Sequence, residues 1–155
     1  NFGNNELNYA SGLVAAADGE LGMDAHVIID TGRNGVVDQR QSCANWCNPR
    51  NAGAGIPSTV QTANTSLVDA YYWLKTPGES DGCTQTLPDG KTCPRFDAGC
   101  ASPDSLGAHS GEEPAPEAGH WYDFQVKQLA EFAKFEGSAA QQQAASDPSS
   151  ATCGA

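Results

Sequence analysis

The chain has 155 residues, and 19 acidic against 8 basic side chains give it a formal net charge of −11. This balance argues against a nucleic-acid-binding protein, because phosphate contacts require clustered lysine and arginine side chains. The sequence has no run of about eighteen apolar residues, so we expect no helix that crosses a membrane.

The first expected elements are a helix and a strand. Apolar residues recur at helical spacing from about Glu6 to Ala17, and the helix is expected to end near Gly19. A strand of the buried type follows at Ala25 to Ile29 and is closed by Asp30-Thr31-Gly32. Arg33 comes next, between glycines, so we expect it in a tight loop.

A second strand lies between two long loops. Residues Val36 to Thr65 have little periodicity and much Gly, Asn, Pro and Ser, which predicts a functional loop rather than core. Leu67 to Leu74 form a strand rich in aromatic and branched residues. The second loop runs from Thr76 to Gly119, and loops of this length are typical of a lid or a binding wall.

A helix is expected to close the ordered part of the chain, from Trp121 to Phe135. We interpret Trp73 and Trp121 as packing residues, because both lie in runs typical of strands or helices. Residues 137–155 are rich in Ala, Gln and Ser and are typical of a linker or tail. The predicted order of helix, strand, loop, strand, loop and helix is that of β/α units.

Three charged residues follow the second strand. Lys75, Glu79 and Asp81 lie on the loop beyond its carboxyl end, which is the side that carries active sites in α/β barrels. On spacing alone, Asp81 would be an ordinary turn residue, because Ser-Asp-Gly is a common turn sequence. Glu79 is equally well interpreted as an exposed loop carboxylate.

Five sequence blocks resemble those of glycoside hydrolase family 6 and occur in the order that the family uses. The blocks are Ile28 to Gly35 (IIDTGRNG), Asn45 to Arg50 (NWCNPR), Trp73 to Gly82 (WLKTPGESDG), Arg95-Phe96-Asp97 with Cys100, and Pro114 to Trp121 (PAPEAGHW). The resemblance covers roughly residues 1 to 135. It implies an α/β fold, a portion of a distorted β/α barrel with long disulfide-tied loops.

The resemblance also implies which part of the barrel is present. In the family these blocks belong to the carboxyl-terminal half, so residues 1–136 are expected to form that half and 137–155 the tail or linker. The proton donor and the amino-terminal part of the barrel are then expected outside this chain. A complete barrel typically needs about 250 residues, which agrees with this expectation.

The implied activity is the inverting hydrolysis of β-1,4-glucosidic bonds in cellulose. Exo-acting family members carry a long loop between the base and the last helix, and Gly82 to Gly119 is long, so the resemblance favours a cellobiohydrolase. The alternative is a non-catalytic, secreted glucan-binding or structural protein that retains the sugar-facing half of the fold. Without the acid it would lose a rate effect of ~10²–10⁴-fold.

The resemblance assigns roles to charged residues. Asp81 matches the catalytic base, and positive charge from Lys75 and Arg33 would keep its carboxylate ionised. Lys75 resembles the lysine that contacts both sugar and base, and Glu79 is assigned to sugar hydroxyls. The alternative for Lys75 and Arg33 is a surface salt bridge, which contributes only ~0–1 kcal/mol.

Trp46 lies in a polar loop, where a purely structural role would be unusual for so large a ring. Exposed indoles stack on flat sugar faces. We therefore assign Trp46 to a glucosyl subsite near the cleavage point.

Six cysteines, an even number, are typical of an oxidising compartment, and sequence alone allows fifteen pairings. The family pattern pairs Cys47 with Cys100. Cys83 and Cys93 bracket a turn and are expected to close a local loop, which leaves Cys43 with Cys153 by elimination. Asn64-Thr65-Ser66 is an N-glycosylation sequon and supports an extracellular location.

No cofactor or metal is expected. His26, His109 and His120 lie far apart, and the sequence contains neither HxxxH nor CxxC. Gly53-Ala54-Gly55 lacks the Lys-Ser/Thr of a phosphate-binding loop, so nucleotide binding is not indicated either.

Overall fold

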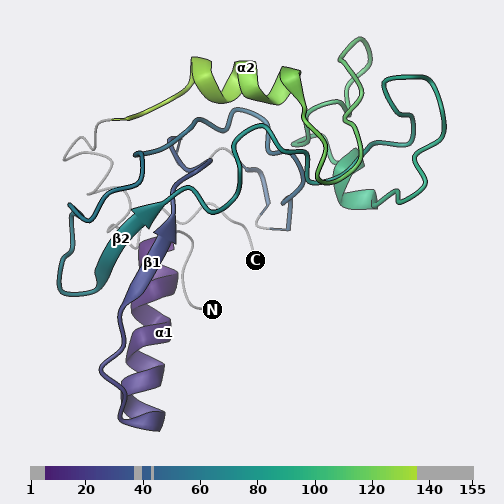
Figure 1. The fold of residues 1–155 in the computed structure, drawn as a ribbon. Coiled ribbons are helices and arrows are strands. Elements are labelled where there is room, and N and C mark those ends of the chain that lie inside the picture. Colours follow the sequence, from purple (N-terminus) through teal and green to yellow (C-terminus); the bar gives the residue numbers. More distant parts are fainter. Residues whose placement is uncertain (1–5, 37–39, 43, 136–155) are drawn as a thin grey trace.

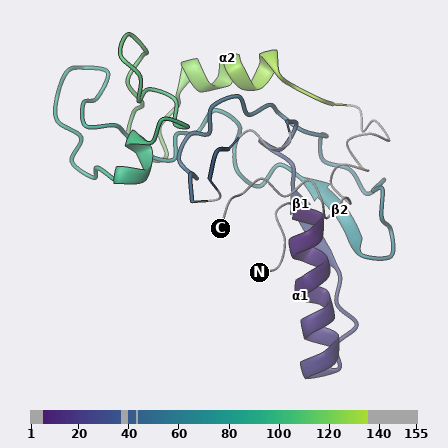
Figure 2. The same ribbon diagram turned by 180° about the vertical axis from the view of Figure 1, so that it is seen from behind.

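The computed structural model describes residues 6–36, 40–42 and 44–135. Its elements are α1 (Glu6–Leu21), β1 (Val27–Asp30), β2 (Val68–Tyr72), the 3-10 helix η1 (Ala98–Ala101) and α2 (Asp123–Glu131). The sheet lies against one end of α1, while α2 lies on the opposite side of the molecule beside the loops of residues 80–120 (Figure 1). Figure 2 shows the same separation from behind. The predicted order of elements is confirmed, and residues 137–155 lie outside the described residues.

Helix α1 continues beyond the predicted end. It passes through Gly19 and ends at Leu21, because Gly22 rather than Gly19 adopts the left-handed conformation, with φ of 62°. The Gly22 amide still donates to the Asp18 carbonyl (2.9 Å). The glycine that stops a helix is therefore the one with positive φ.

Strands β1 and β2 pair in parallel, with Ile28 opposite Ala70 and Asp30 opposite Tyr72. Parallel pairing brings both carboxyl ends to one edge of the sheet. The residues that follow β1 and those that follow β2 consequently meet at this edge, which is where the charged residues of both loops lie.

The prediction that the first strand is fully buried is wrong. Ile29 is buried, but Ile28 is 58% exposed, and on β2 Tyr72 is 50% exposed. Neighbouring side chains of a strand point to opposite faces. Among the described helices and strands, only α1 contacts the sheet, so the other face has no covering element.

Part of the first long loop belongs to the core, against the prediction for Val36 to Thr65. The four small residues at positions 52–55 are buried and connect the loop after β1 to α2. The connecting bonds are Gly55 N to Thr31 O (2.9 Å), Gly35 N to Gly53 O (2.8 Å) and Ala54 N to Leu129 O (3.0 Å). We name residues 52–55 the strut.

Side-chain size explains why the strut can be buried without apolar bulk. A Cβ atom on Gly53 would lie 2.0 Å from the Phe132 carbonyl oxygen, and one on Gly35 would lie 2.4 Å from the Ala54 carbonyl oxygen. Backbone thus packs directly on backbone at both places. The Ala-Gly-Ala-Gly pattern has no apolar periodicity, so it gave no core signal.

Helix α2 is shorter than predicted and buries Gln125 and Leu129. Trp121 was expected to pack, but it precedes the helix and is 61% exposed, because its backbone pairs with Glu79 instead. Trp73 does pack, since it is half-buried and its Nε1 donates to the Ile56 carbonyl (3.0 Å).

The core beside α2 consists of Leu106, Ala115 and Tyr122. The Tyr122 hydroxyl donates to the Glu113 carbonyl (2.6 Å), and burial raises the pKa of this hydroxyl. This core fixes the second long loop against the helix.

We expect Gly53→Ala to lower the free energy of unfolding by roughly 1–3 kcal/mol or more, because the methyl group would overlap the Phe132 carbonyl. The matched control is Gly19→Ala in α1, where nothing lies within 4 Å of the new Cβ. That change should stabilise by about 0.5–1 kcal/mol. Urea titration of both variants measures the two free energies of unfolding. Equal changes in the two variants would contradict the close backbone packing of residues 52–55.

Candidate active site

The segment Gly78 to Gly82 follows β2 and is held by the chain just before α2. Ser80 N donates to the His120 carbonyl (2.8 Å), and Gly119 N donates to the Ser80 carbonyl (3.0 Å). Tyr122 N donates to the Gly78 carbonyl (2.8 Å). These bonds give the loop that carries Glu79 and Asp81 the rigidity of a short strand pair.

The Asp81 carboxylate is nearly buried, with 8% of its side chain exposed, and has two cationic partners. Arg33 Nη1 lies 2.6 Å from Asp81 Oδ2, and Lys75 Nζ lies 3.3 Å from Oδ1. The backbone amide of Asn48 also donates to Oδ2 (2.8 Å). The Asp81 carboxylate is thus held by a guanidinium, an ammonium and a backbone amide.

Asp30 brings the two cations together. At the end of β1, its Oδ1 accepts from Gly32 N and its Oδ2 accepts from Lys75 N, both at 2.9 Å. The loops after β1 and β2 are thereby joined. A Cβ on Gly32 would lie 2.7 Å from the Lys75 carbonyl oxygen, so glycine is required for this approach.

Glu79 lies at the outer side of the same cluster. Its Oε1 is 3.5 Å from Lys75 Nζ, and its side chain is 36% exposed. Lys75 therefore contacts both carboxylates of the loop. The structure thus brings four predicted residues together: Arg33, Lys75, Glu79 and Asp81.

Trp46 lies close to this cluster and is 46% exposed. It shares with Arg33 and Lys75 the lining of an open cavity of about 520 Å³, of which Ile28 and Leu13 form an apolar part. A Cβ on Gly99 would lie 2.9 Å from the indole Nε1, so this glycine leaves room for the ring. An exposed indole beside cationic donors is suited to a sugar ring.

Sequence reasoning missed Asn48. The residue is fully buried and has a positive φ of 40°. Its side-chain oxygen accepts from Asp81 N (2.7 Å), and its Nδ2 donates to the Gly82 carbonyl (2.9 Å). Asparagine is a common turn residue, so no pattern in the sequence distinguished it, although it lies inside the block Asn45 to Arg50.

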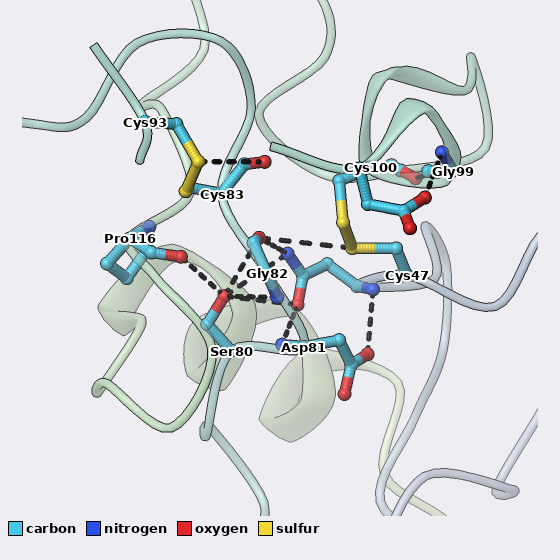
Figure 3. Close-up of a disulfide and its surroundings, with 12 residues drawn as sticks. Cys47, Ser80, Asp81, Gly82, Cys83, Cys93, Gly99, Cys100 and Pro116 are labelled. Atoms are coloured by element: carbon cyan, nitrogen blue, oxygen red, sulfur yellow. Dashed lines mark hydrogen bonds between the residues drawn. A yellow bond between two sulfur atoms is a disulfide. The ribbon is translucent and has the colours of Figure 1, made fainter. Parts of the chain in front are cut away.

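Two disulfides flank the loop. Figure 3 shows Gly82 between the Cys47–Cys100 bond and the Cys83–Cys93 bond, with Ser80 and Asp81 below. Both pairs are those expected from the sequence. A Cβ on Gly82 would lie 2.8 Å from Cys100 Sγ, so the loop packs directly on the first bond. Cys43 and Cys153 lie outside the described residues.

A partly buried ion pair holds the outer part of the second long loop. Arg50 donates through Nη1 to Glu112 Oε1 (2.5 Å) and through Nη2 to Oε2 (2.8 Å). Arg50 Nη2 also donates to the Ser105 carbonyl (2.9 Å). The hydrogen bonds from Arg50 lower the pKa of the Glu112 carboxyl, and those to Glu112 raise the pKa of Arg50.

Among the described residues, His, Cys, Asp and Glu side chains form no group of three or more that could hold a metal ion. No helix in the same part of the chain is long and apolar enough to cross a membrane.

Comparison with protein families gives one match that spans most of the chain. The family described as "Glycosyl hydrolases family 6" matches residues 1–133. The chain therefore belongs to glycosyl hydrolases family 6. A "Probable 1,4-beta-D-glucan cellobiohydrolase C" from Aspergillus terreus is 43% identical over 111 residues, which are 71% of this chain and 21% of the relative.

Solved structures give the same assignment. CcCel6C, a family 6 enzyme from Coprinopsis cinerea, matches with a TM-score of 0.68 and 39% identity over 84% of this chain and 33% of that chain. A mutant of cellobiohydrolase Cel6A from Humicola insolens, in complex with methyl-tetrathio-alpha-d-cellopentoside, matches with a TM-score of 0.68 and 32% identity, over 83% of this chain and 32% of that chain. The predicted fold class, a portion of this family's distorted α/β barrel, is confirmed. The chain spans about a fifth of the curated relative and a third of the solved structures.

The Arg50–Glu112 pair generates a pH prediction. Because the pKa of Glu112 is lowered from its ordinary value of 4.5, its contribution to stability is full above that value and is lost as the pH falls through the lowered pKa. Glu112→Gln should therefore lower the free energy of unfolding by roughly 1–3 kcal/mol at neutral pH. The difference from wild type should shrink below about pH 4.

Denaturant titrations from neutral to acidic pH test this expectation. The control is the neighbouring, exposed Glu113, where the Gln variant should stay within about 0.5 kcal/mol of wild type. A Glu112→Gln effect that is independent of pH would contradict the role of the ionised carboxylate.

Proposed function

We propose that residues 1–136 form part of the catalytic domain of an inverting β-1,4-glucan hydrolase of the cellobiohydrolase type. The observation that carries the proposal is the Asp81 carboxylate, nearly buried between Arg33 and Lys75 at the carboxyl ends of two parallel strands. The names of the relatives support cellulose as the substrate, and the cellopentoside derivative bound to the Humicola insolens enzyme supports a linear glucan.

Asp81 acts as the base in this proposal. Oδ2 accepts two hydrogen bonds, whereas among the described residues Oδ1 has only Lys75 Nζ nearby, at 3.3 Å. Oδ1 is therefore the oxygen that takes a proton from water, directly or through a second water. The water oxygen then bonds to the anomeric carbon while the glycosidic C–O bond breaks, with inversion.

The leaving oxygen requires a proton from an acid about 6.5–9.5 Å from the base. We assign this donor to a part of the barrel outside residues 1–155. The share of the relatives that the chain covers supports this assignment, since about two-thirds of each matched catalytic domain has no counterpart here.

The remaining site residues bind substrate in the proposal. Trp46 stacks on a glucosyl ring, and Glu79 and Lys75 hydrogen-bond sugar hydroxyls at the cleavage point. Arg33 serves the base, which its 2.6 Å contact with Asp81 supports. The exo mode is supported by the second long loop, whose anchors at Cys47–Cys100 and Arg50–Glu112 hold it beside the site as a wall.

The rest of the barrel is the proposed partner of the exposed sheet face. Ile28 and Tyr72 are 58% and 50% exposed there, and full burial of a side chain such as isoleucine is worth ~1.5–3 kcal/mol. β1 also has no second strand neighbour among the described residues. A further β/α unit would cover both the face and the edge.

An extracellular location completes the proposal. The disulfides Cys47–Cys100 and Cys83–Cys93 fit an oxidising compartment. Asn64, in the loop before β2, is the proposed glycosylation site, and its side-chain oxygen accepts a hydrogen bond from Ser66 Oγ (2.8 Å). This loop lies at the end of β2 opposite the site, so a glycan would not obstruct it.

Asp81→Asn and Trp46→Ala in the full-length protein test the two main roles. Asp81→Asn should lower kcat on cello-oligosaccharides by ~10²–10⁴-fold in a protein that still folds, because it removes the base and keeps the shape. Trp46→Ala should instead weaken binding by about 10-fold or more, because stacking is lost. Steady-state kinetics, calorimetry and NMR detection of the product anomer measure the two effects.

Near-wild-type kcat in Asp81→Asn would remove Asp81 from the mechanism. A wild-type protein that binds glucan without hydrolysis would instead favour the non-catalytic alternative. Retention of the anomeric configuration would contradict inversion.

Complementation tests the partner. Residues 1–155 expressed alone should self-associate, because an apolar face and a strand edge are exposed. Coexpression with the remaining part of the catalytic domain should instead give an active one-to-one complex. Ile28→Arg should abolish the complex, whereas Val60→Arg, at a loop position that is 78% exposed, should not. A monomeric chain that hydrolyses glucan alone would contradict the proposal.

A further inference from the structure

We propose that Asn48 is a positioning residue for Asp81, which it holds through its backbone amide and both ends of its side-chain amide. The inference rests on the proposed role of Asp81 as base. It adds a second requirement to that role, because the base must be held in one orientation as well as kept charged.

Asn48 makes hydrogen bonds to the Asp81 carboxylate and to the backbone on either side of it. Its backbone N donates to Asp81 Oδ2 (2.8 Å), so it binds the carboxylate. Its Oδ1 accepts from Asp81 N (2.7 Å), and its Nδ2 donates to the carbonyl of Gly82 (2.9 Å). One side chain thus fixes the backbone before and after the base, while its own amide fixes the reactive group.

The backbone of Asn48 is adapted to this task. Its φ of 40° lies in the left-handed region, which asparagine tolerates better than most residues but which still carries a cost. Most other residue types would disfavour the left-handed backbone conformation or lack a side chain with both a hydrogen-bond donor and an acceptor. Asparagine provides both.

Asn48 is itself fixed from three directions. The preceding residue is Cys47, which the disulfide ties to Cys100. Gln125 on α2 donates through Nε2 to Asn48 Oδ1 (3.4 Å), and Ser80 Oγ lies 3.4 Å from Nδ2. Asn48 and Gln125 are at most 1% exposed. The hydrogen bond between them is therefore shielded from competing water.

The consequence concerns the two oxygens of the base. Arg33 and the Asn48 amide together occupy Oδ2, which leaves Oδ1, with Lys75 Nζ at 3.3 Å, as the oxygen that accepts a proton. Arg33 reaches Oδ2 through its side chain, whereas Asn48 reaches it through its backbone amide. Misplacement of a catalytic group by about 1 Å can cost 10²-fold in rate.

The test is Asn48→Gly in the full-length protein. Glycine retains the left-handed conformation and the backbone amide but deletes both side-chain hydrogen bonds. We expect kcat on cello-oligosaccharides to fall by about 10–100-fold, with KM within about threefold of wild type, because the residues that bind sugar are unchanged. The matched control is Asn51→Gly, also at positive φ (62°) but exposed, for which both constants should stay within about twofold.

A second measurement does not depend on activity. Hydrogen exchange of the Asp81 amide, read by mass spectrometry, should accelerate at least about 10-fold in Asn48→Gly and remain unchanged in Asn51→Gly, because the amide loses its acceptor. If Asn48→Gly does not fold at the assay temperature, the isosteric Asn48→Asp is assayed in its place and should show the same fall in kcat, since an oxygen replaces the donor to Gly82.

The outcomes separate the two proposals. Unchanged kcat in Asn48→Gly, or an equal loss in Asn51→Gly, overturns the positioning role while leaving Asp81 as the base. If the wild-type protein does not hydrolyse glucan, the proposed function fails, and the exchange of the Asp81 amide then decides whether Asn48 holds this segment. Unchanged exchange overturns the inference in that case as well.

Discussion

The site depends on one carboxylate that is not itself reactive. Asp30 ends β1 and binds the amides of Gly32 and Lys75, so the two strands are joined at their carboxyl ends by a side chain as well as by the sheet. Parallel strands pair over only a few residues here, and without this joint the two loops would diverge. The positions of Arg33 and Lys75 on either side of Asp81 follow from it.

Charge neutralisation is the second constraint. The chain as a whole is strongly acidic, yet at this edge two cations, Arg33 and Lys75, pair with the carboxylates of Glu79 and Asp81. A nearly buried carboxylate is costly unless it is paired and hydrogen-bonded. Three of the eight basic residues, Arg33, Lys75 and Arg50, pair with carboxylates that are largely buried.

Much of this arrangement was predictable from the sequence, because strands and charged loop residues leave local signals. Apolar runs located β1 and β2, and the loop after β2 located Lys75, Glu79 and Asp81. The strut at residues 52–55 was not predictable, because its burial comes from the absence of side chains. The exposure of Ile28 and Trp121 depends on which elements cover them, which local patterns do not contain.

Asn48 illustrates the remaining limit. Its importance lies in three hydrogen bonds to residues more than thirty positions away, and a short polar residue in a polar loop carries no mark of such partners. The sequence block around it was informative only as a resemblance. Residue roles that depend on long-range backbone contacts become visible only in three dimensions.

The Cys47–Cys100 bond joins the two long loops through cysteines that are 53 positions apart. Cys47 directly follows Trp46, and the bond packs against Gly82, the residue after Asp81. Its two sulfur atoms can meet only when the first and second long loops are already apposed. Formation of this bond therefore requires the segments that carry Trp46 and Asp81 to lie side by side. The geometry of the site is in this sense linked to the oxidation of two thiols, which a reducing environment would reverse.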